Sequence, residues 1–523
     1  MMIKKHYRLP IKAEQYKWWA LGVTIIGGFM SILDTSIVNI AIPKMMAVFS
    51  VNADDAQWVL TAYMLTMGVV QPATGYLCDV YGTRRMYLLS LAVFVLGSAL
   101  CGTAWSNDTM IAFRVLQAIG GGLIIPVTMS IVYQIFPEHE RNMAMGIWGI
   151  SAMVAPAIGP TLSGYFVEYW DWRLIFTINI PIGVVGYVMA MLVLEETPLA
   201  VSHRFDYGGL ITSAVGLFCL LLALSKGVSE GWTSAYIITL FFLAATNLII
   251  FIFIELDHPE PLLDLSLFSD WNFSCSMLGI FLGTMALFGG IFMVPLYLES
   301  IMGYTAMQTG LLLFPSAATA GVMMPIAARL ADRFGPKPII VIGLTTLMLG
   351  SLPLVYVDMD TNYQYVMMVM FVRGIGLGMS LMLITVMGMN TVPFSKISRA
   401  SSLNNAIRQI SGSLGIAILT TVMQNRQIFH LEHIASNMNQ ASQATRNIIN
   451  YGEKMFLHRG DVAGIAHQKA LALVSGIAQR QSYIFSFDDT FFVLFLICGI
   501  GVIPALLLKP VKNKKGPAVM LAE

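Results

Sequence analysis

The residues with the clearest chemical potential are two opposite charges inside long apolar stretches. Asp34 lies in "SILDTSIVNIAIP" and is the only charged residue between Lys17 and Lys44. Arg114 begins "RVLQAIGGG", in another apolar stretch, and Gln117 follows three residues later. A carboxylate at membrane depth is costly and marks a functional candidate, often in proton transfer. Asp34 is therefore a candidate proton carrier, with a purely structural charge pair as the alternative.

The elements that must position these charges are membrane-spanning helices. The 523 residues are 57% hydrophobic and 11% charged, whereas a soluble domain has about 25% charged residues. A spanning helix needs about 20 mostly apolar residues. The segments that meet this requirement number fourteen and are 18–41, 56–78, 86–105, 109–133, 143–168, 173–194, 208–226, 234–255, 272–299, 306–328, 337–357, 363–389, 403–424 and 489–509. The predicted fold class is an all-α integral membrane protein.

Counting along the first and fourth predicted spans places Asp34 and Arg114 at similar depths. Asp34 lies about 24 Å along its helix from the inner end, which leaves about 6 Å of a hydrocarbon core. Arg114 lies about 8 Å from the outer end of its own helix. We expect Arg114 to pair with Asp34 and Gln117, one turn further on, to hydrogen-bond to either.

Lys and Arg residues are unevenly divided between the two sides of the predicted spans. If the N-terminus is inside, the cytoplasmic segments contain eighteen of them and the short outer loops contain three. Cytoplasmic loops of membrane proteins carry such an excess. The sequence therefore predicts a multi-pass protein of the cytoplasmic (inner) membrane with both termini in the cytoplasm, which agrees with an even number of spans.

Two motifs occur twice. "GYLCDVYGTRR" (75–85) is matched by "ARLADRFGPKP" (328–338), and "RVLQAIGGG" (114–122) is matched by "RGIGLGMS" (373–380). Repeated halves around a midplane site are typical of transporters. The predicted parts are a cytoplasmic N-terminus (1–17), a first six-helix half (18–194), an inserted helix pair (208–255), a second six-helix half (272–509) containing a long extracytoplasmic loop (425–488), and a cytoplasmic tail (510–523).

Together these motifs resemble the major facilitator superfamily, and within it the fourteen-helix drug:proton antiporters of the EmrB type. Further matching motifs, in the same order, are "LDTSIVNIAIP" (33–43), "GPTLSG" (159–164), "WDWRLIFTINIPIG" (170–183) and "FDYGG" (205–209). The sequence departs from the usual pattern at Val80, Thr83, Ala118 and Ser163. The resemblance implies a major facilitator fold and a proton-driven antiporter that exports lipophilic drugs or toxic compounds by alternating access. The proton gradient would then replace any cofactor.

The resemblance also implies roles for particular residues. Arg114 would modulate the proton on Asp34. A latch at the cytoplasmic gate, in which Arg side chains pair across the cleft, would involve Gly75, Asp79, Gly82, Arg84 and Arg85, with Asp332, Gly335 and Lys337 as its second copy. The motif associated with antiport contributes Gly159, Pro160 and Gly164, where small residues permit close helix packing and a local kink.

Two further charges lie within predicted spans of the second half. Arg373 and Arg408 have no acidic residue in the same spans. They are candidates for a substrate cavity that accepts an anionic group, or for contacts with backbone carbonyls. Because Asp34 is nearly alone among acids near mid-membrane, we expect lipophilic substrates that are neutral or anionic.

Other classes of function fit the sequence less well. It contains no Walker A motif for ATP hydrolysis, and all eight His residues lie outside the predicted spans, which argues against a membrane-embedded enzyme. No metal or nucleic acid ligand is expected. A dedicated exporter of one metabolite, siderophore or lipid is the alternative. The resemblance implies a membrane-fusion adaptor and an outer-membrane channel as possible partners. They would be contacted through 425–488, a polar segment predicted to contain helical stretches, which could instead be a lid.

Overall fold

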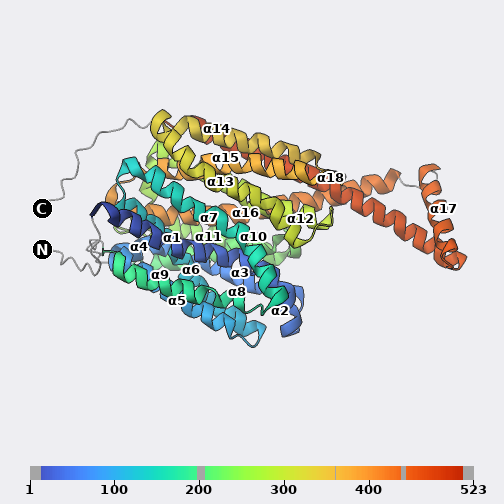
Figure 1. The fold of residues 1–523 in the computed structure, drawn as a ribbon, viewed down its shortest axis with the longest axis horizontal. Helices are drawn as coiled ribbons and strands as arrows, with labels where there is room; N and C mark the ends of the chain where they lie inside the picture. Colours follow the sequence, from blue (N-terminus) through green and yellow to red (C-terminus); the bar gives the residue numbers. More distant parts are fainter. Residues whose placement is uncertain (1–12, 197–205, 360, 438–442, 510–523) are drawn as a thin grey trace.

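The computed structural model describes residues 13–196, 206–359, 361–437 and 443–509, and within these ranges the regular elements are all helices (Figure 1). The helices of the first half are α1 (Ala13–Ile37), α2 (Ile42–Phe49), α3 (Ala53–Val70), α4 (Ala73–Tyr81), α5 (Thr83–Gly102), α6 (Asn107–Ile135), α7 (Glu138–Tyr169), α8 (Leu174–Thr177) and α9 (Asn179–Val193). The remaining α-helices are α10 (Tyr207–Glu230), α11 (Ala235–Asp257), α12 (Trp271–Ser300), α13 (Ala306–Phe334), α14 (Pro336–Ser351), α15 (Tyr363–Met389), α16 (Ile397–Asn437), α17 (Gln443–His458) and α18 (Ala463–Leu507). Four short 3-10 helices are η1 (Asn39–Ala41), η2 (Leu265–Ser269), η3 (Leu352–Tyr356) and η4 (Phe394–Lys396).

Thirteen of the described helical segments are long and apolar enough to cross a membrane. The predicted span that is absent from this set is 56–78, which the structure divides between α3 and α4. The interruption falls at Gln71 and Pro72, where the proline has no backbone N–H to donate to the preceding turn. The fourteenth predicted span therefore corresponds to two shorter helices in succession.

The helix contacts of the first half recur in the second half. α5 packs on α6, and α14 packs on α15. α1 contacts α7 and α9, and α12 makes the corresponding contacts with α16 and α18. The repeat seen in the sequence motifs is therefore also a repeat of packing, with α10 and α11 placed between the two copies in the chain.

Glycines allow the paired helices to approach closely in both halves. A Cβ atom at Gly120 of α6 would lie 2.4 Å from the Phe94 backbone nitrogen of α5. A Cβ atom at Gly376 of α15 would lie 2.4 Å from the Leu347 backbone nitrogen of α14. Without a hydrophobic driving force between helices in lipid, such backbone contact provides much of the packing energy. It also fixes where side chains near these glycines point.

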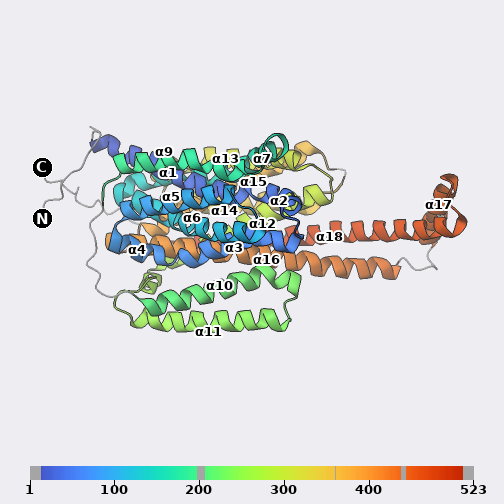
Figure 2. The same ribbon diagram turned by 90° about the horizontal axis from the view of Figure 1, so that it is seen from below.

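The inserted helices α10 and α11 lie beside the two halves (Figure 2). α10 contacts α3 of the first half and α16 of the second. A Cβ atom at Gly68 of α3 would lie 2.3 Å from Leu221 Cδ1 of α10 and 3.3 Å from Gln409 Cγ of α16. The pair therefore packs along one side of the boundary between the halves.

The segment 425–488 is mainly helical where the structure describes it, which confirms the helical stretches predicted within it. α16 continues to Asn437, and α18 begins at Ala463. Helices of 41 and 45 residues rise about 1.5 Å per residue and so exceed a hydrocarbon core of about 30 Å. The excess projects away from the bundle and carries α17 at its end (Figures 1 and 2). The predicted helical stretches are therefore continuations of the long helices α16 and α18.

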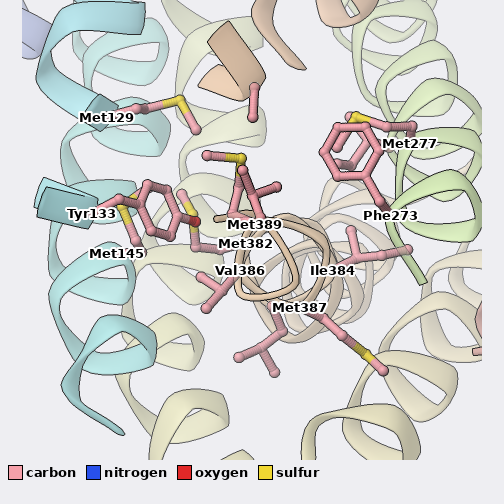
Figure 3. Close-up of a cluster of buried hydrophobic side chains, with 14 of the residues drawn as sticks. Met129, Tyr133, Met145, Phe273, Met277, Met382, Ile384, Val386, Met387 and Met389 are labelled. Atoms are coloured by element: carbon pink, nitrogen blue, oxygen red, sulfur yellow. The ribbon is translucent and has the colours of Figure 1, made fainter. Parts of the chain in front are cut away.

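A methionine-rich cluster of buried side chains lies where α6, α7, α12 and α15 approach one another (Figure 3). Met129 and Tyr133 come from α6, Met145 comes from α7, and Met382 comes from α15. All four are buried. Flexible methionine side chains fill irregular space and can repack, so this junction between the halves is apolar and adaptable.

We predict that Gly120→Ala lowers stability by about 1–3 kcal/mol, because the added methyl group forces α5 and α6 apart. Gly164→Ala is the matched control, since no atom lies within 4 Å of a Cβ placed there, and its effect should be about 0.5 kcal/mol or less. Thermal unfolding of the two purified variants, followed by intrinsic fluorescence, measures the difference. Equal unfolding temperatures would contradict the close α5–α6 contact.

Candidate functional site

Asp34 of α1 and Arg114 of α6 form an ion pair in the interior of the first half. The Arg114 Nη1 atom donates a hydrogen bond to Asp34 Oδ2 over 2.5 Å, and both side chains are completely buried. The contact predicted from their depths is present. An ion pair of this kind is held away from both lipid and water, so any change in the charge of one partner acts directly on the other.

Two amide side chains complete the set of donors to the carboxylate. Gln117 Nε2 donates to Asp34 Oδ1 over 2.8 Å, and Asn179 Nδ2 of α9 donates to the same oxygen over 3.0 Å. Arg114 Nη1 also donates to Gln117 Oε1 over 2.7 Å. Two helices, α6 and α9, thus direct hydrogen bonds at one carboxylate of α1, and such charge-assisted bonds stabilise its ionised form.

A second layer of polar groups comes from α5 and α3. Ser98 Oγ accepts hydrogen bonds from Gln117 Nε2 (2.6 Å) and Asn179 Nδ2 (3.1 Å). The guanidinium carbon of Arg114 lies 3.8 Å from the centre of the Tyr63 ring, within the range of a cation–π interaction. The charge pair is therefore connected to five helices of the first half.

Sequence reasoning missed Asn179, Ser98 and Tyr63. Asn179 lies in the quoted motif "WDWRLIFTINIPIG", and its amide in an apolar segment was an available signal. Ser98 and Tyr63 gave no such signal in the sequence, because single hydroxyl groups are common in membrane helices. Among the described residues, three buried atoms of this site have no hydrogen-bond partner, namely Asn179 Oδ1, Arg114 Nη2 and the Tyr63 hydroxyl. The network therefore has unused hydrogen-bonding capacity beside the carboxylate.

The ends of the two halves that carry the repeated loop motif, predicted to be cytoplasmic, are joined by polar contacts. Asp79 of α4 forms an ion pair with Arg399 of α16, with 3.0 Å between Oδ2 and Nε. The pKa of the Asp79 carboxyl is raised, because burial outweighs the opposing effect of Arg399. A Cβ atom at Gly75 would lie 2.7 Å from the Arg399 Cα atom, so the two backbones touch at this point.

A second pair of helices meets in the same way. Asn142 Nδ2 of α7 donates to Asp332 Oδ1 of α13 over 2.7 Å. Arg141 Nη1, also of α7, donates to Asn390 Oδ1 after α15 over 3.1 Å. Both copies of the repeated loop motif thus place their aspartate against the opposite half.

Arg84 and Arg85 do not pair across the cleft, which corrects the prediction made for them. Arg84 Nη2 donates to the Met191 carbonyl (2.9 Å), and Arg85 lies 3.3 Å from Glu196. Both partners belong to the first half. Arg399 and Arg141 do contact the opposite half, and the sequence showed both only as predicted cytoplasmic positive charges.

The remaining residues of the gating motifs have local roles. Gly82 and Gly335 have φ angles of 90° and 87°, which favour glycine, and each ends one helix immediately before the next begins. Lys337 is half-buried and makes no ion pair within the described part of the chain. The two turns are equivalent in backbone shape, although their charged contacts differ.

The antiport motif lies on α7, and only part of its predicted packing is present. A Cβ atom at Gly159 would lie 2.1 Å from Ser36 Oγ of α1, so α7 and α1 are close there. No atom lies within 4 Å of a Cβ placed at Gly164, and the close packing predicted at this glycine is wrong. Pro160 falls within α7, but its side chain lies outside the described atoms.

Arg408 of α16 lies at the boundary between the halves. Its Nε donates to Asn404 Oδ1 (2.9 Å), and its Nη2 donates to Thr385 Oγ1 of α15 (2.6 Å). Tyr133 of α6 is close enough to interact electrostatically. Arg408 is half-buried, and Arg373 of α15 is buried, at 4% exposure. Neither makes an ion pair with any described residue.

Comparison with known proteins agrees with this architecture. The model of the Major Facilitator Superfamily matches residues 24–416. The crystal structure of the human organic anion transporter MFSD10 (TETRAN) superimposes with a TM-score of 0.59, covering 92% of this chain and 99% of that one. At 13% sequence identity this likeness establishes the fold alone.

Relatives in sequence are bacterial. The uncharacterized MFS-type transporter YhcA of Bacillus subtilis (strain 168) is 34% identical and covers 94% of this chain and 93% of its own length. The multidrug resistance protein Stp of Mycobacterium tuberculosis (strain ATCC 25618 / H37Rv) is 33% identical, with 76% and 74% covered. The fatty acid resistance protein FarB of Neisseria gonorrhoeae is 29% identical, with 93% and 96% covered. The chain is a multi-pass membrane transporter that belongs to the Major Facilitator Superfamily.

Proposed function

We propose that this transporter exports lipophilic toxic compounds across the cytoplasmic membrane in exchange for protons. Its relatives include proteins named for multidrug resistance and for fatty acid resistance, and members of the family are transporters rather than enzymes. The observation that carries the proposal is the fully buried pair of Asp34 and Arg114. An adaptor and an outer-membrane channel stay predictions of the sequence resemblance.

Proton binding at Asp34 would change the pair in a defined way. A protonated carboxyl loses its charge, so its attraction to Arg114 falls and its O–H needs an acceptor. Asn179 Oδ1 is buried without a partner beside it, and rotation of the Asn179 amide would present this oxygen to the new donor. Protonation of Asp34 on α1 would thereby change a hydrogen bond made by α9, on which Asn179 lies.

The gate contacts support alternating access as the mechanism. In the described conformation, the inner ends of the halves are held together by Asp79–Arg399 and Asn142–Asp332. α4 contacts α16 extensively, whereas α3, further out on the same crossing, makes few contacts with it. This arrangement corresponds to a closed cytoplasmic gate. Opening it requires these cross-half contacts to break together.

The substrate path proposed here lies between the halves, near the methionine cluster and Arg408. The cluster provides an adaptable apolar surface, and Arg408 contributes a positive charge that no described carboxylate neutralises. Lipophilic neutral or anionic compounds fit this combination better than cations do. Fatty acids, which are lipophilic carboxylates, fit it and appear in the name of the relative FarB.

We expect Asp34→Asn to abolish proton-driven export while leaving substrate exchange intact, because the amide keeps the size of the side chain but cannot carry a proton. The loss should be about tenfold or more, the scale at which a positioned proton-transfer group matters. Everted vesicles with an imposed proton gradient measure export, and counterflow without a gradient tests folding. Asp108→Asn, at the exposed start of α6, is the control. Continued uphill transport by Asp34→Asn would refute the proton role.

Removing Arg399 should favour the conformation that is open to the cytoplasm. The Arg399→Ala change deletes a part-buried ion pair, and a shift of about 1 kcal/mol corresponds to a roughly fivefold change in population. Spin labels on the inner ends of α4 and α16 report the distance between the halves. Arg84→Ala, which loses only a contact within the first half, should leave the distance distribution unchanged. If both variants behave alike, the Asp79–Arg399 pair is not a gate contact.

Substitution of Arg408 should separate anionic from neutral substrates. Loss of a charged hydrogen bond costs about 1.5–3 kcal/mol, so Arg408→Gln should raise KM for a lipophilic carboxylate about tenfold or more. KM for a neutral lipophile should change much less, and Arg408→Lys should retain part of the preference. Transport in proteoliposomes over both compound types provides the comparison. Equal losses for both types would show that Arg408 acts on folding or gating instead.

A further inference from the structure

Arg373 is a buried cation for which the described residues provide no counter-charge. It lies on α15 with 4% of its surface exposed. Its Nη1 atom is buried without a hydrogen-bond partner, and no described carboxylate lies within ion-pair distance. An uncompensated charge inside a membrane protein is strongly unfavourable. A group other than the described side chains must therefore neutralise it.

The first half shows what such an arginine ordinarily contacts in this fold. Arg373 opens "RGIGLGMS" as Arg114 opens "RVLQAIGGG", and α15 packs on α14 as α6 packs on α5. Arg114 has the Asp34 carboxylate, the Gln117 amide and the Tyr63 ring as partners. The repeat therefore provides an internal comparison in which only the partners differ.

Two of these partners have smaller, uncharged counterparts around Arg373. Gly290 of α12, the counterpart of α1, packs against the guanidinium without a side chain, since a Cβ atom there would lie 2.2 Å from Arg373 Nη2. Gly376 occupies the place of Gln117 in the motif. The Cys498 thiol of α18 is close enough to interact electrostatically with Arg373, and its sulfur lies 3.8 Å from Ser351 Oγ of α14.

We infer that Arg373 binds a small monovalent anion, such as chloride, in the interior of the second half. The anion has the neutralising role that the Asp34 carboxylate has beside Arg114, and the buried Nη1–H is its free donor. A halide suits such a site, because it accepts hydrogen bonds without a fixed geometry. A small carboxylate such as acetate shares this chemistry.

The experiment compares thermal unfolding of the purified full chain in sodium chloride, bromide, acetate and gluconate at equal ionic strength. A ligand that binds only the folded state raises Tm with its concentration. We expect Tm of the wild type to be higher in chloride and bromide than in gluconate, and acetate shows whether carboxylates share the site. Equal Tm values in chloride, bromide, acetate and gluconate would overturn the inference.

Variants assign the effect to one arginine. Arg373→Gln should abolish the difference in Tm between chloride and gluconate, whereas Arg408→Gln, the matched change at the other intramembrane arginine, should keep it. An unchanged chloride effect in Arg373→Gln would locate the anion elsewhere and refute the site.

A complementary variant keeps the test decisive if Arg373→Gln does not fold. Gly290→Asp supplies a built-in carboxylate beside Arg373, and the atom it approaches is the flexible end of that side chain. We expect Gly290→Asp to lose the chloride effect and Gly290→Ala to retain it. A chloride effect that persists in Gly290→Asp would contradict competition for Arg373. None of these outcomes bears on Asp34, so the proton proposal stands or falls separately.

Discussion

The cost of placing a charge inside a membrane is the constraint from which the rest of this structure follows. Asp34 and Arg114 are both fully buried, and breaking such a pair by removing one partner costs about 3–5 kcal/mol. The surrounding helices are arranged to prevent that loss, since Gln117 and Asn179 bind the carboxylate and the Tyr63 ring covers the guanidinium. The site responds strongly to a single proton, because the contacts of Arg114, Gln117 and Asn179 with Asp34 are all made to the negatively charged carboxylate.

Helix packing determines how that response can spread. Gly97 and Gly120 bring α5 and α6 into backbone contact, so that Ser98 and Gln117 lie at fixed positions beside the charge pair. Asn179 reaches the same carboxylate from α9. The cytoplasmic contacts, by contrast, depend on side chains such as Asp79 and Arg399, which can separate without disturbing the interior of either half. Rigid halves joined by separable contacts are what rocking around a central site requires.

The sequence was most informative where a physical rule acts locally. The absence of other charges around Asp34, together with 1.5 Å of rise per residue, predicted its contact with Arg114. Local rules of this kind do not predict which residues from distant segments of the sequence come into contact. Nothing near Asp79 indicated Arg399, and the polar composition of 425–488 predicted helical stretches without showing that they continue α16 and begin α18. Composition distinguishes water from lipid as surroundings, but it does not distinguish a loop from a helix that continues into water.

The two halves share a fold but differ in the partners that they provide for buried arginines. The first half neutralises its buried arginine with a titratable carboxylate, whereas the second half places two arginines, Arg373 and Arg408, without an acid among the described residues. Within the described residues, the first half thus presents its buried arginine with a carboxylate, and the second half presents its buried arginine with a glycine. Both halves meet at the methionine cluster, so a change of charge in either half can influence the same boundary. The halves match in helix packing, and the difference at Gly290, where α12 offers no side chain to Arg373, is what distinguishes their charged interiors.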